Sequence, residues 1–166
     1  MTIPFFDLLI ATQTDQTPDE DDDWSKYILQ ASFDGRLKSD EGFLSATGDL
    51  ATLTAASGKD LYLTGAKITY FCNSNAATAF ANNEVVLKIN GTIVETTNAS
   101  LGAGGTNVTN GMVSIPYEFK NIGHKVAATQ IIKLEVISLD AEVDVEGFIQ
   151  AIEVPTGENP TTYANP

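Results

Sequence analysis

The sequence predicts an all-β domain, an antiparallel β-sandwich of about eight strands. Apolar and polar residues alternate with a period of two over most of the chain after Trp24, and threonine is abundant, with 19 among 166 residues. Turn-forming residues separate these runs, and no segment of convincing length between Trp24 and Pro155 has a helical period. The jelly roll is the commonest eight-stranded sandwich, and the lack of a fixed-period repeat disfavours propellers and solenoids.

Composition divides the chain into three parts. Residues 1–24 are expected to form an extended N-terminal arm with an acidic tether, residues 25–155 the sandwich, and residues 156–166 a polar C-terminal tail. The net charge is −13; residues 1–24 hold seven acidic residues and no basic one, whereas the remainder holds 15 acidic and 9 basic residues. This balance argues against binding to nucleic-acid phosphates or to anionic membranes.

The arm begins with an apolar segment, MTIPFFDLLIA at residues 1–11. No basic residue precedes it, and Pro4 and Asp7 interrupt it, so it does not have the pattern of a signal peptide. Its large apolar side chains are expected to be buried against another surface, because exposed in water they would promote aggregation. They either pack on the chain's own core or dock on a neighbouring subunit or another protein. The candidate partner-binding residues are Ile3, Phe5, Phe6, Leu8, Leu9 and Ile10.

An acidic run follows the apolar segment. Its interpretation is a solvated linker, because adjacent like charges repel one another in any compact form. A cation site is the alternative, although the run lacks the glycine and the distal glutamate of an EF-hand loop. The residues that such a site would use are Asp19, Glu20, Asp21, Asp22 and Asp23.

The first predicted strands cover residues 26–33, 48–55 and 60–71. In the first of them the alternation places Leu29 and Ala31 on one face. In the third, the apolar residues change parity at Gly65, which predicts a bulge or kink there.

The strongest local signal is a hairpin over residues 84–97, because Asn90-Gly91 supplies the positive φ angles of a type I′ turn. The strand predicted over residues 113–119 contains Pro116, which requires an edge position or irregular pairing. The last two strands are predicted over residues 130–138 and 143–155, and Gly147 is expected to precede a change of facing.

The residues that catalysis needs are scarce, since the chain has one histidine, one cysteine and one arginine. His124 is expected to be a turn or surface residue, and Cys72 a small buried hydrophobe. We therefore expect no enzymatic activity and no cofactor or metal. A sandwich enzyme or a cupin-like metal protein would need several histidine and carboxylate ligands.

Other polar and aromatic features have ordinary structural interpretations. Asp140, Glu142, Asp144 and Glu146 share one parity and would form a solvated negative ridge on an outer face. Tyr62, Tyr70, Tyr117 and Phe119 are expected in the core or at a subunit interface rather than in a sugar-binding platform. The loops at residues 73–83 and 98–110 would carry the site if the protein bound a receptor or a carbohydrate.

Five segments together resemble the jelly-roll virion proteins of tailed phages, of the capsid decoration or head auxiliary type. They are GKDLYLTGAKITYF, EVVLKINGTIVETT, GMVSIPYEF, GHKVAATQIIKLEVIS and EVDVEGFIQAIE, and the similarity covers residues 57–154. The resemblance lies in strand rhythm and turn placement. It implies a trimer around a capsid symmetry axis and an N-terminal arm that reaches a neighbour or the shell.

These observations lead to an expected function. The chain is expected to be a non-enzymatic decoration or cement protein of a virion, assembled in the host cytoplasm. It would form a homo-oligomer, expected to be a trimer, and would bind the major capsid protein or another virion protein through its arm. The alternative is a receptor- or carbohydrate-binding module of a tail fibre or a cell-surface protein.

Overall fold

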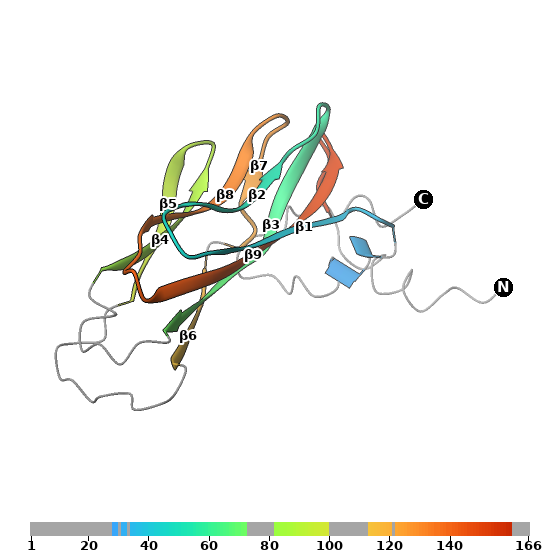
Figure 1. The fold of residues 1–166 in the computed structure, drawn as a ribbon. Helices are drawn as coiled ribbons and strands as arrows, with labels where there is room; N and C mark the ends of the chain where they lie inside the picture. The colour runs from blue at the N-terminus through green and yellow to red at the C-terminus, as the bar shows by residue number, and fades with distance from the viewer. Residues whose placement is uncertain are drawn as a thin grey trace.

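The computed structural model describes residues 28–29, 31–32, 34–72, 82–99, 113–120 and 122–160. Within these residues the chain is a sandwich of two antiparallel sheets (Figure 1). Its nine strands are β1 (Leu37–Leu44), β2 (Gly48–Thr54), β3 (Lys59–Cys72), β4 (Asn83–Ile89), β5 (Thr92–Ala99), β6 (Val113–Glu118), β7 (Lys125–Val126), β8 (Ile131–Ser138) and β9 (Val143–Pro155).

The strand order is that of a jelly roll. Sheet A has the order β1-β9-β3-β6, with the short β7 also paired to β3, and sheet B has the order β2-β8-β4-β5. The pairs are nested: β4 pairs with β5, β3 with β6 and β7, β2 with β8, and β1 with β9. The sequence prediction of an all-β jelly-roll sandwich is therefore confirmed.

The main core lies between the sheets, and the alternation predicted for the long strands supplies it. β9 buries Val143, Val145 and Ile149, while β8 buries Ile132 and Leu134. A second, smaller cluster lies at one end of the sandwich and consists of Ala31, Tyr62, Ile152 and Val154, with Ile28, Leu37 and Ile122 packed against it.

Three local predictions are confirmed. Asn90 and Gly91 join β4 to β5 with φ angles of 48° and 82°, as a type I′ turn requires. The pairing of β3 with β9 shifts register between Leu63 and Gly65, so that the residues on either side of this bulge join the same core. Pro116 lies in β6, at the edge of sheet A.

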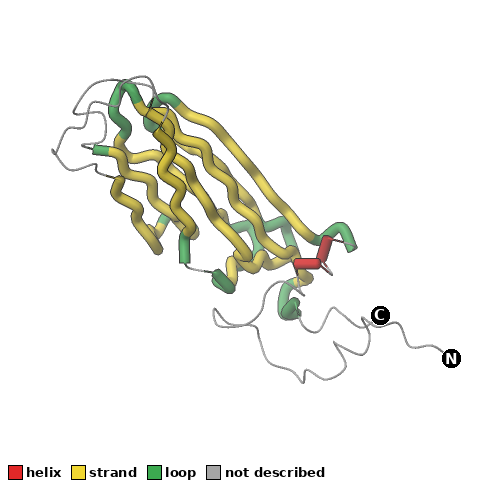
Figure 2. Tube along the Cα trace, turned by 90° about the horizontal axis from the view of Figure 1, so that it is seen from below, coloured by secondary structure: helices red, strands yellow, loops and turns green. Residues whose placement is uncertain are grey.

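Two predictions are wrong. Residues 28, 29, 31 and 32 are helical, not a strand (Figure 2): Ala31 is fully buried, whereas Leu29 is 46% exposed. The edge of β9 is instead occupied by β1, which the sequence analysis did not predict. In β9 the facing does not change after Gly147: Ile149 and Ala151 remain in the main core, whereas Ile152 and Val154 lie on the opposite face of the strand, which the second cluster covers.

The two sheets approach each other closely at a pair of glycines. Gly42 of β1 pairs with Gly147 of β9, and Leu50 of β2 occupies the space over both. A β-carbon on Gly42 would lie 1.8 Å from the carbonyl oxygen of Leu50, so the backbone of β2 passes where a larger residue would stand.

Candidate functional site

Most of the predicted site residues lie outside the described part of the chain. This holds for the apolar arm residues Ile3, Phe5, Phe6, Leu8, Leu9 and Ile10 and for the acidic run Asp19, Glu20, Asp21, Asp22 and Asp23. It also holds for most of the two loops, at residues 73–81 and 100–112.

The described residues that follow the predicted arm pack on one end of the sandwich, which we call the arm pole. Ala31 is completely buried there against the second core cluster. The amide of Arg36 donates to the carbonyl of Ala31 at 2.8 Å, and the amide of Glu153 in β9 donates to the carbonyl of Arg36 at 2.9 Å. The chain therefore enters β1 from a fixed position at this pole.

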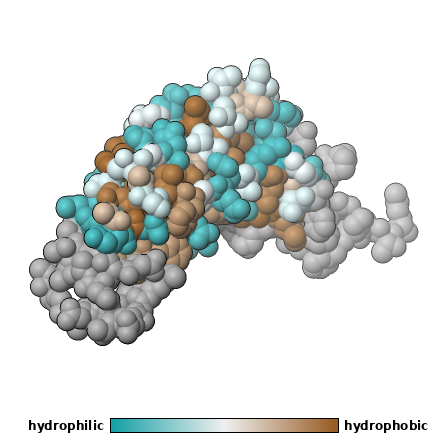
Figure 3. Space-filling model, viewed as in Figure 1, coloured by the Kyte–Doolittle hydropathy of each residue, from teal (hydrophilic) through white to brown (hydrophobic). Residues whose placement is uncertain are grey.

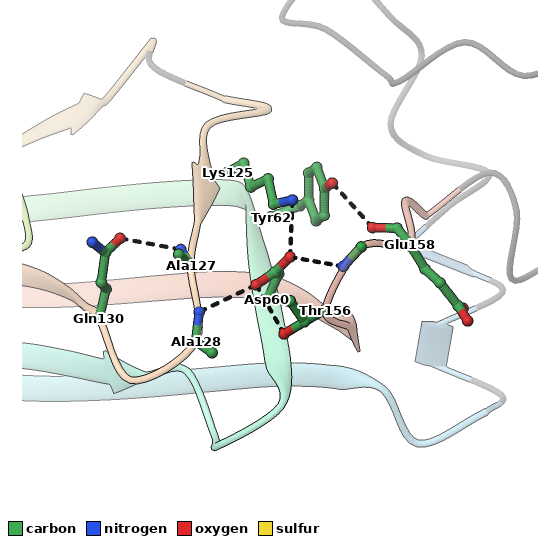
Figure 4. A network of polar contacts seen from close by, with 9 residues as sticks. Asp60, Tyr62, Lys125, Ala127, Ala128, Gln130, Thr156 and Glu158 are labelled. Atoms are coloured by element: carbon green, nitrogen blue, oxygen red, sulfur yellow. Dashed lines mark hydrogen bonds and ion pairs between the residues drawn. The ribbon is translucent and has the colours of Figure 1, made fainter.

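A buried carboxylate stabilises the arm pole (Figure 4). Asp60, which is 1% exposed, accepts hydrogen bonds from the amide of Ala128 at 3.1 Å and from the hydroxyl of Thr156 at 3.3 Å. It also lies 2.9 Å from the ammonium of Lys125 and 3.5 Å from the amide of Gly157. One side chain thus joins β3, the turn after β7 and the end of β9.

The electrostatics of this pole favour the ionised pair. Burial opposes ionisation of Asp60, but the hydrogen bond and charge of Lys125, with the amides of Gly157 and Ala128, outweigh it and lower the pKa of the Asp60 carboxyl. The hydrogen bond to Asp60 raises the pKa of the Lys125 amine. The partners of this carboxylate come from three separate segments, so the ion pair and the hydrogen bonds stabilise this end of the sandwich.

Hydrogen bonds of polar side chains also connect the strand ends at the opposite end of the sandwich, which we call the loop pole. The side chain of Asn83 donates to the carboxylate of Asp140 at 3.1 Å and accepts from the amide of Asp140 at 2.9 Å. The hydroxyl of Ser138 donates to the carbonyl of Asn82. The predicted negative ridge is present only in part. Asp140 is bound to Asn83 at this pole, whereas Asp144 and Glu146 point outward from β9.

The strand ends that flank the two loops lie at this pole. Cys72 at the end of β3 pairs with Val113 at the start of β6 and with Val143 at the start of β9. Asn83 at the start of β4 pairs with Ala99 at the end of β5. The arm pole and the loop pole are therefore at opposite ends of the sheets (Figure 1).

The outer face of sheet B carries a ladder of ion pairs. The ammonium of Lys133 lies 2.8 Å from Asp49 and 2.9 Å from Glu135, and the ammonium of Lys88 lies 2.9 Å from the same oxygen of Glu135. The hydrogen bonds to Asp49 and Glu135 raise the pKa of Lys133, and those from Lys88 and Lys133 lower the pKa of Glu135. A concavity of about 240 Å³ lies between this ladder and the hairpin turn at Asn90.

The outer face of sheet A has a different character. Phe43, Phe71 and Phe148 point outward from β1, β3 and β9, and Phe43 is 58% exposed. Figure 3 shows hydrophobic residues interspersed among hydrophilic ones on the side turned to the viewer. The sequence alone does not reveal this aromatic set, because only the register of three strands distant in sequence brings its members together.

The residues considered for catalysis lie apart. His124 is exposed in the turn before β7, and Cys72 is buried at the end of β3, as predicted. Tyr62, Tyr70 and Phe119 are in the core. Over the described ranges, no group of three or more histidine, cysteine, aspartate or glutamate residues could hold a metal ion. No helix in the same ranges is long and apolar enough to span a membrane.

Comparisons with known proteins give distant likenesses. No family model and no curated protein matches the chain. The chain is similar to dimeric latent PorU from Porphyromonas gingivalis, with 12% identity and a TM-score of 0.41 over 72% of this chain; it spans only 13% of the PorU chain.

Two further likenesses are to smaller chains. The capsid structure of Helicobacter pylori bacteriophage KHP30 has 14% identity and a TM-score of 0.32, covering 71% of this chain and 92% of that one. The CBM36-1 domain of a xylanase from the hindgut metagenome of Trinervitermes trinervoides has 18% identity and a TM-score of 0.29, covering 74% and 98%. Identities and TM-scores this low carry no information on function.

Proposed function

We propose that this chain is a non-enzymatic structural protein of a virion, a decoration or cement protein. Its arm, residues 1–24, would join it to the major capsid protein or another virion protein, and the sandwich would form a homo-oligomer, expected to be a trimer. Assembly in the host cytoplasm follows from this role.

The observation that supports the proposal is the arm pole. The described residues at 28–29 and 31–32 are packed on one end of the sandwich, with Ala31 fully buried, and Asp60 connects the neighbouring turns. An arm that starts from a fixed position loses less conformational entropy on binding a partner than an arm that starts from a mobile segment. Each large apolar side chain that the arm buries contributes about 1.5–3 kcal/mol. Several such arms in one oligomer would reinforce each other.

Removal of residues 2–18 tests the proposal. The shortened chain should keep the far-UV circular dichroism and thermal midpoint of the full chain, because the described sandwich begins after the deletion. It should no longer co-sediment with capsids of the virus that encodes it. Deletion of residues 161–166 is the matched control and should leave co-sedimentation unchanged.

A double variant, Phe5→Ser with Phe6→Ser, separates apolar docking from tethering. It should lose capsid binding as the deletion does, whereas Asp15→Asn should not. Normal assembly of the arm-deleted chain would contradict the proposal. If the deleted chain also kept glycan binding that changes in the loops at 73–83 or 98–110 abolish, the protein would be a carbohydrate-binding module instead.

A further inference from the structure

The register of sheet A places two apolar pairs around one carboxylate on its outer face. Phe43 pairs directly with Glu146, and Phe148 is the next outward residue along β9, so the two rings lie on a diagonal. Phe71 and Pro116 stand on the equivalent diagonal between β3 and β6. Side chains on such diagonals are about 7–8 Å apart, within reach of aromatic rings. Glu146 lies between the two pairs.

The charge on this face is unbalanced. Lys67 pairs with Glu118 at 3.2 Å, with both side chains more than half exposed. The other outward acidic residues are Glu41, Asp144 and Glu146, and they have no ion pair within the described part of the chain. Among the described residues, three carboxylates without an ion pair therefore lie near exposed Phe43 and half-buried Phe71 and Phe148, and Lys67 is already paired with Glu118.

Sheet B provides the internal comparison. Its outer face also exposes apolar side chains, including Ile93 at 52% and Ile137 at 41%. There, however, the two lysines of the ion-pair ladder are matched by two carboxylates, Asp49 and Glu135. With Glu84, which also points outward from β4, that face carries three carboxylates against two lysines and its exposed apolar side chains are aliphatic. The part of the sheet A face around the phenylalanines carries four carboxylates against Lys67 and is aromatic. Aromatic residues are enriched at the energetic centres of protein interfaces, and complementary charge selects the partner.

We propose that the outer face of sheet A docks a basic protein surface. Arginine or lysine side chains of the partner would pair with Glu41, Asp144 and Glu146, and Phe43 with Phe148 would be the aromatic anchor. A second copy of this chain fits poorly, because a two-fold contact would set the same carboxylates against each other. None of these residues belongs to the arm, so the proposal adds a second contact to the proposed function and does not depend on it.

The test uses the full chain and a short synthetic peptide that alternates arginine with leucine. The peptide should shift amide resonances of β1, β3 and β9 in NMR spectra, and its affinity should fall steeply with salt. Phe43→Ser and Glu146→Gln should each weaken binding about tenfold. Both side chains are exposed, so neither variant disturbs the core; Ile93→Ser on sheet B is the matched control and should bind normally.

Several outcomes would overturn the proposal. A peptide that alternates glutamate with leucine must not bind, and the shifts must not fall on sheet B. Equal affinity of the arginine peptide for the wild type, Phe43→Ser and Glu146→Gln would also contradict it. If Phe43→Ser instead reduced self-association and left peptide binding unchanged, the occupant would be a second copy. Deletion of residues 2–18 should not alter peptide binding, which separates this result from the test of the arm.

Discussion

Alanine at position 147 should destabilise the sandwich by overpacking its core. A β-carbon there would lie 2.3 Å from Cδ2 and 2.7 Å from Cγ of Leu50, and 3.3 Å from Cδ1 of Leu134. Leu50 is 4% exposed and Leu134 fully buried, so neither side chain can turn out into solvent. The new methyl group must therefore displace β2 or force an unfavourable rotamer.

Overpacking by one methyl group costs about 1–3 kcal/mol. For a chain of this size, that lowers the thermal midpoint by roughly 2–4 °C for each kcal/mol. Gly65→Ala is the matched control in the same sheet: its β-carbon would meet nothing within 4 Å, so the change should stay within about 1 kcal/mol. Gly42→Ala should be worse than Gly147→Ala, because it meets the backbone carbonyl of Leu50 rather than a side chain.

Urea denaturation followed by circular dichroism measures these free energies of unfolding. A double-mutant cycle tests whether overlap with Leu50 causes the destabilisation, because Leu50→Ala removes the side-chain atoms that the new methyl group of Gly147→Ala would contact. Leu50→Ala alone should cost about 2–5 kcal/mol. The double variant should then be more stable than the sum of the two single changes predicts, by about 1 kcal/mol or more. Overpacking at position 147 is refuted if Gly147→Ala costs no more than Gly65→Ala, or if the free-energy changes of Gly147→Ala and Leu50→Ala simply add.

Three further substitutions test other parts of the fold. Asp60→Asn should lower the thermal midpoint at neutral pH. Because folding lowers the pKa of Asp60, the ionised carboxylate stabilises the folded chain at pH values above its unfolded pKa of about 3.9. The difference in thermal midpoint from the wild type should therefore shrink as the pH falls below about 4. Tyr70→Phe removes the 2.8 Å hydrogen bond to Thr97 and should cost about 0.5–1.5 kcal/mol in the same urea assay, since Thr97 keeps its bond to a backbone carbonyl. Gly91→Ala should cost about 1–2 kcal/mol, because φ is 82° there, with Asn90→Gly as a nearly neutral control.

The parts of the fold that the sequence predicts correctly are those fixed by local rules. The hairpin at Asn90-Gly91 depends on two residues, and the bulge at Gly65 on a change of parity within one strand. Pro116 is confined to an edge strand by its missing amide. Each of these signals is complete within a few residues, so no knowledge of distant partners is needed.

The features that were not predicted from the sequence involve strands whose pairing partners are remote in sequence. β1 reads LKSDEGFL, and most of its inward positions are polar or glycine, so alternation does not reveal it. Its pairing is decided by the open edge of β9, at the other end of the chain. The outward phenylalanines are hidden for the same reason, since Phe43 and Phe148 become neighbours only through that pairing. The arm, by contrast, is conspicuous in sequence because its charge and apolarity are local.

The nested pairing also determines where foreign sequence can be added. Because Leu37 pairs with Ile152, β1 begins and β9 ends at the arm pole, and a peptide fused after β9 would leave the sandwich next to the start of β1. A peptide inserted between Cys72 and Asn83 would instead leave from the other end of the sheets. If the arm contacts the capsid, as the proposed function states, an insertion between Cys72 and Asn83 would therefore point away from that contact, whereas a fusion after β9 would lie next to it.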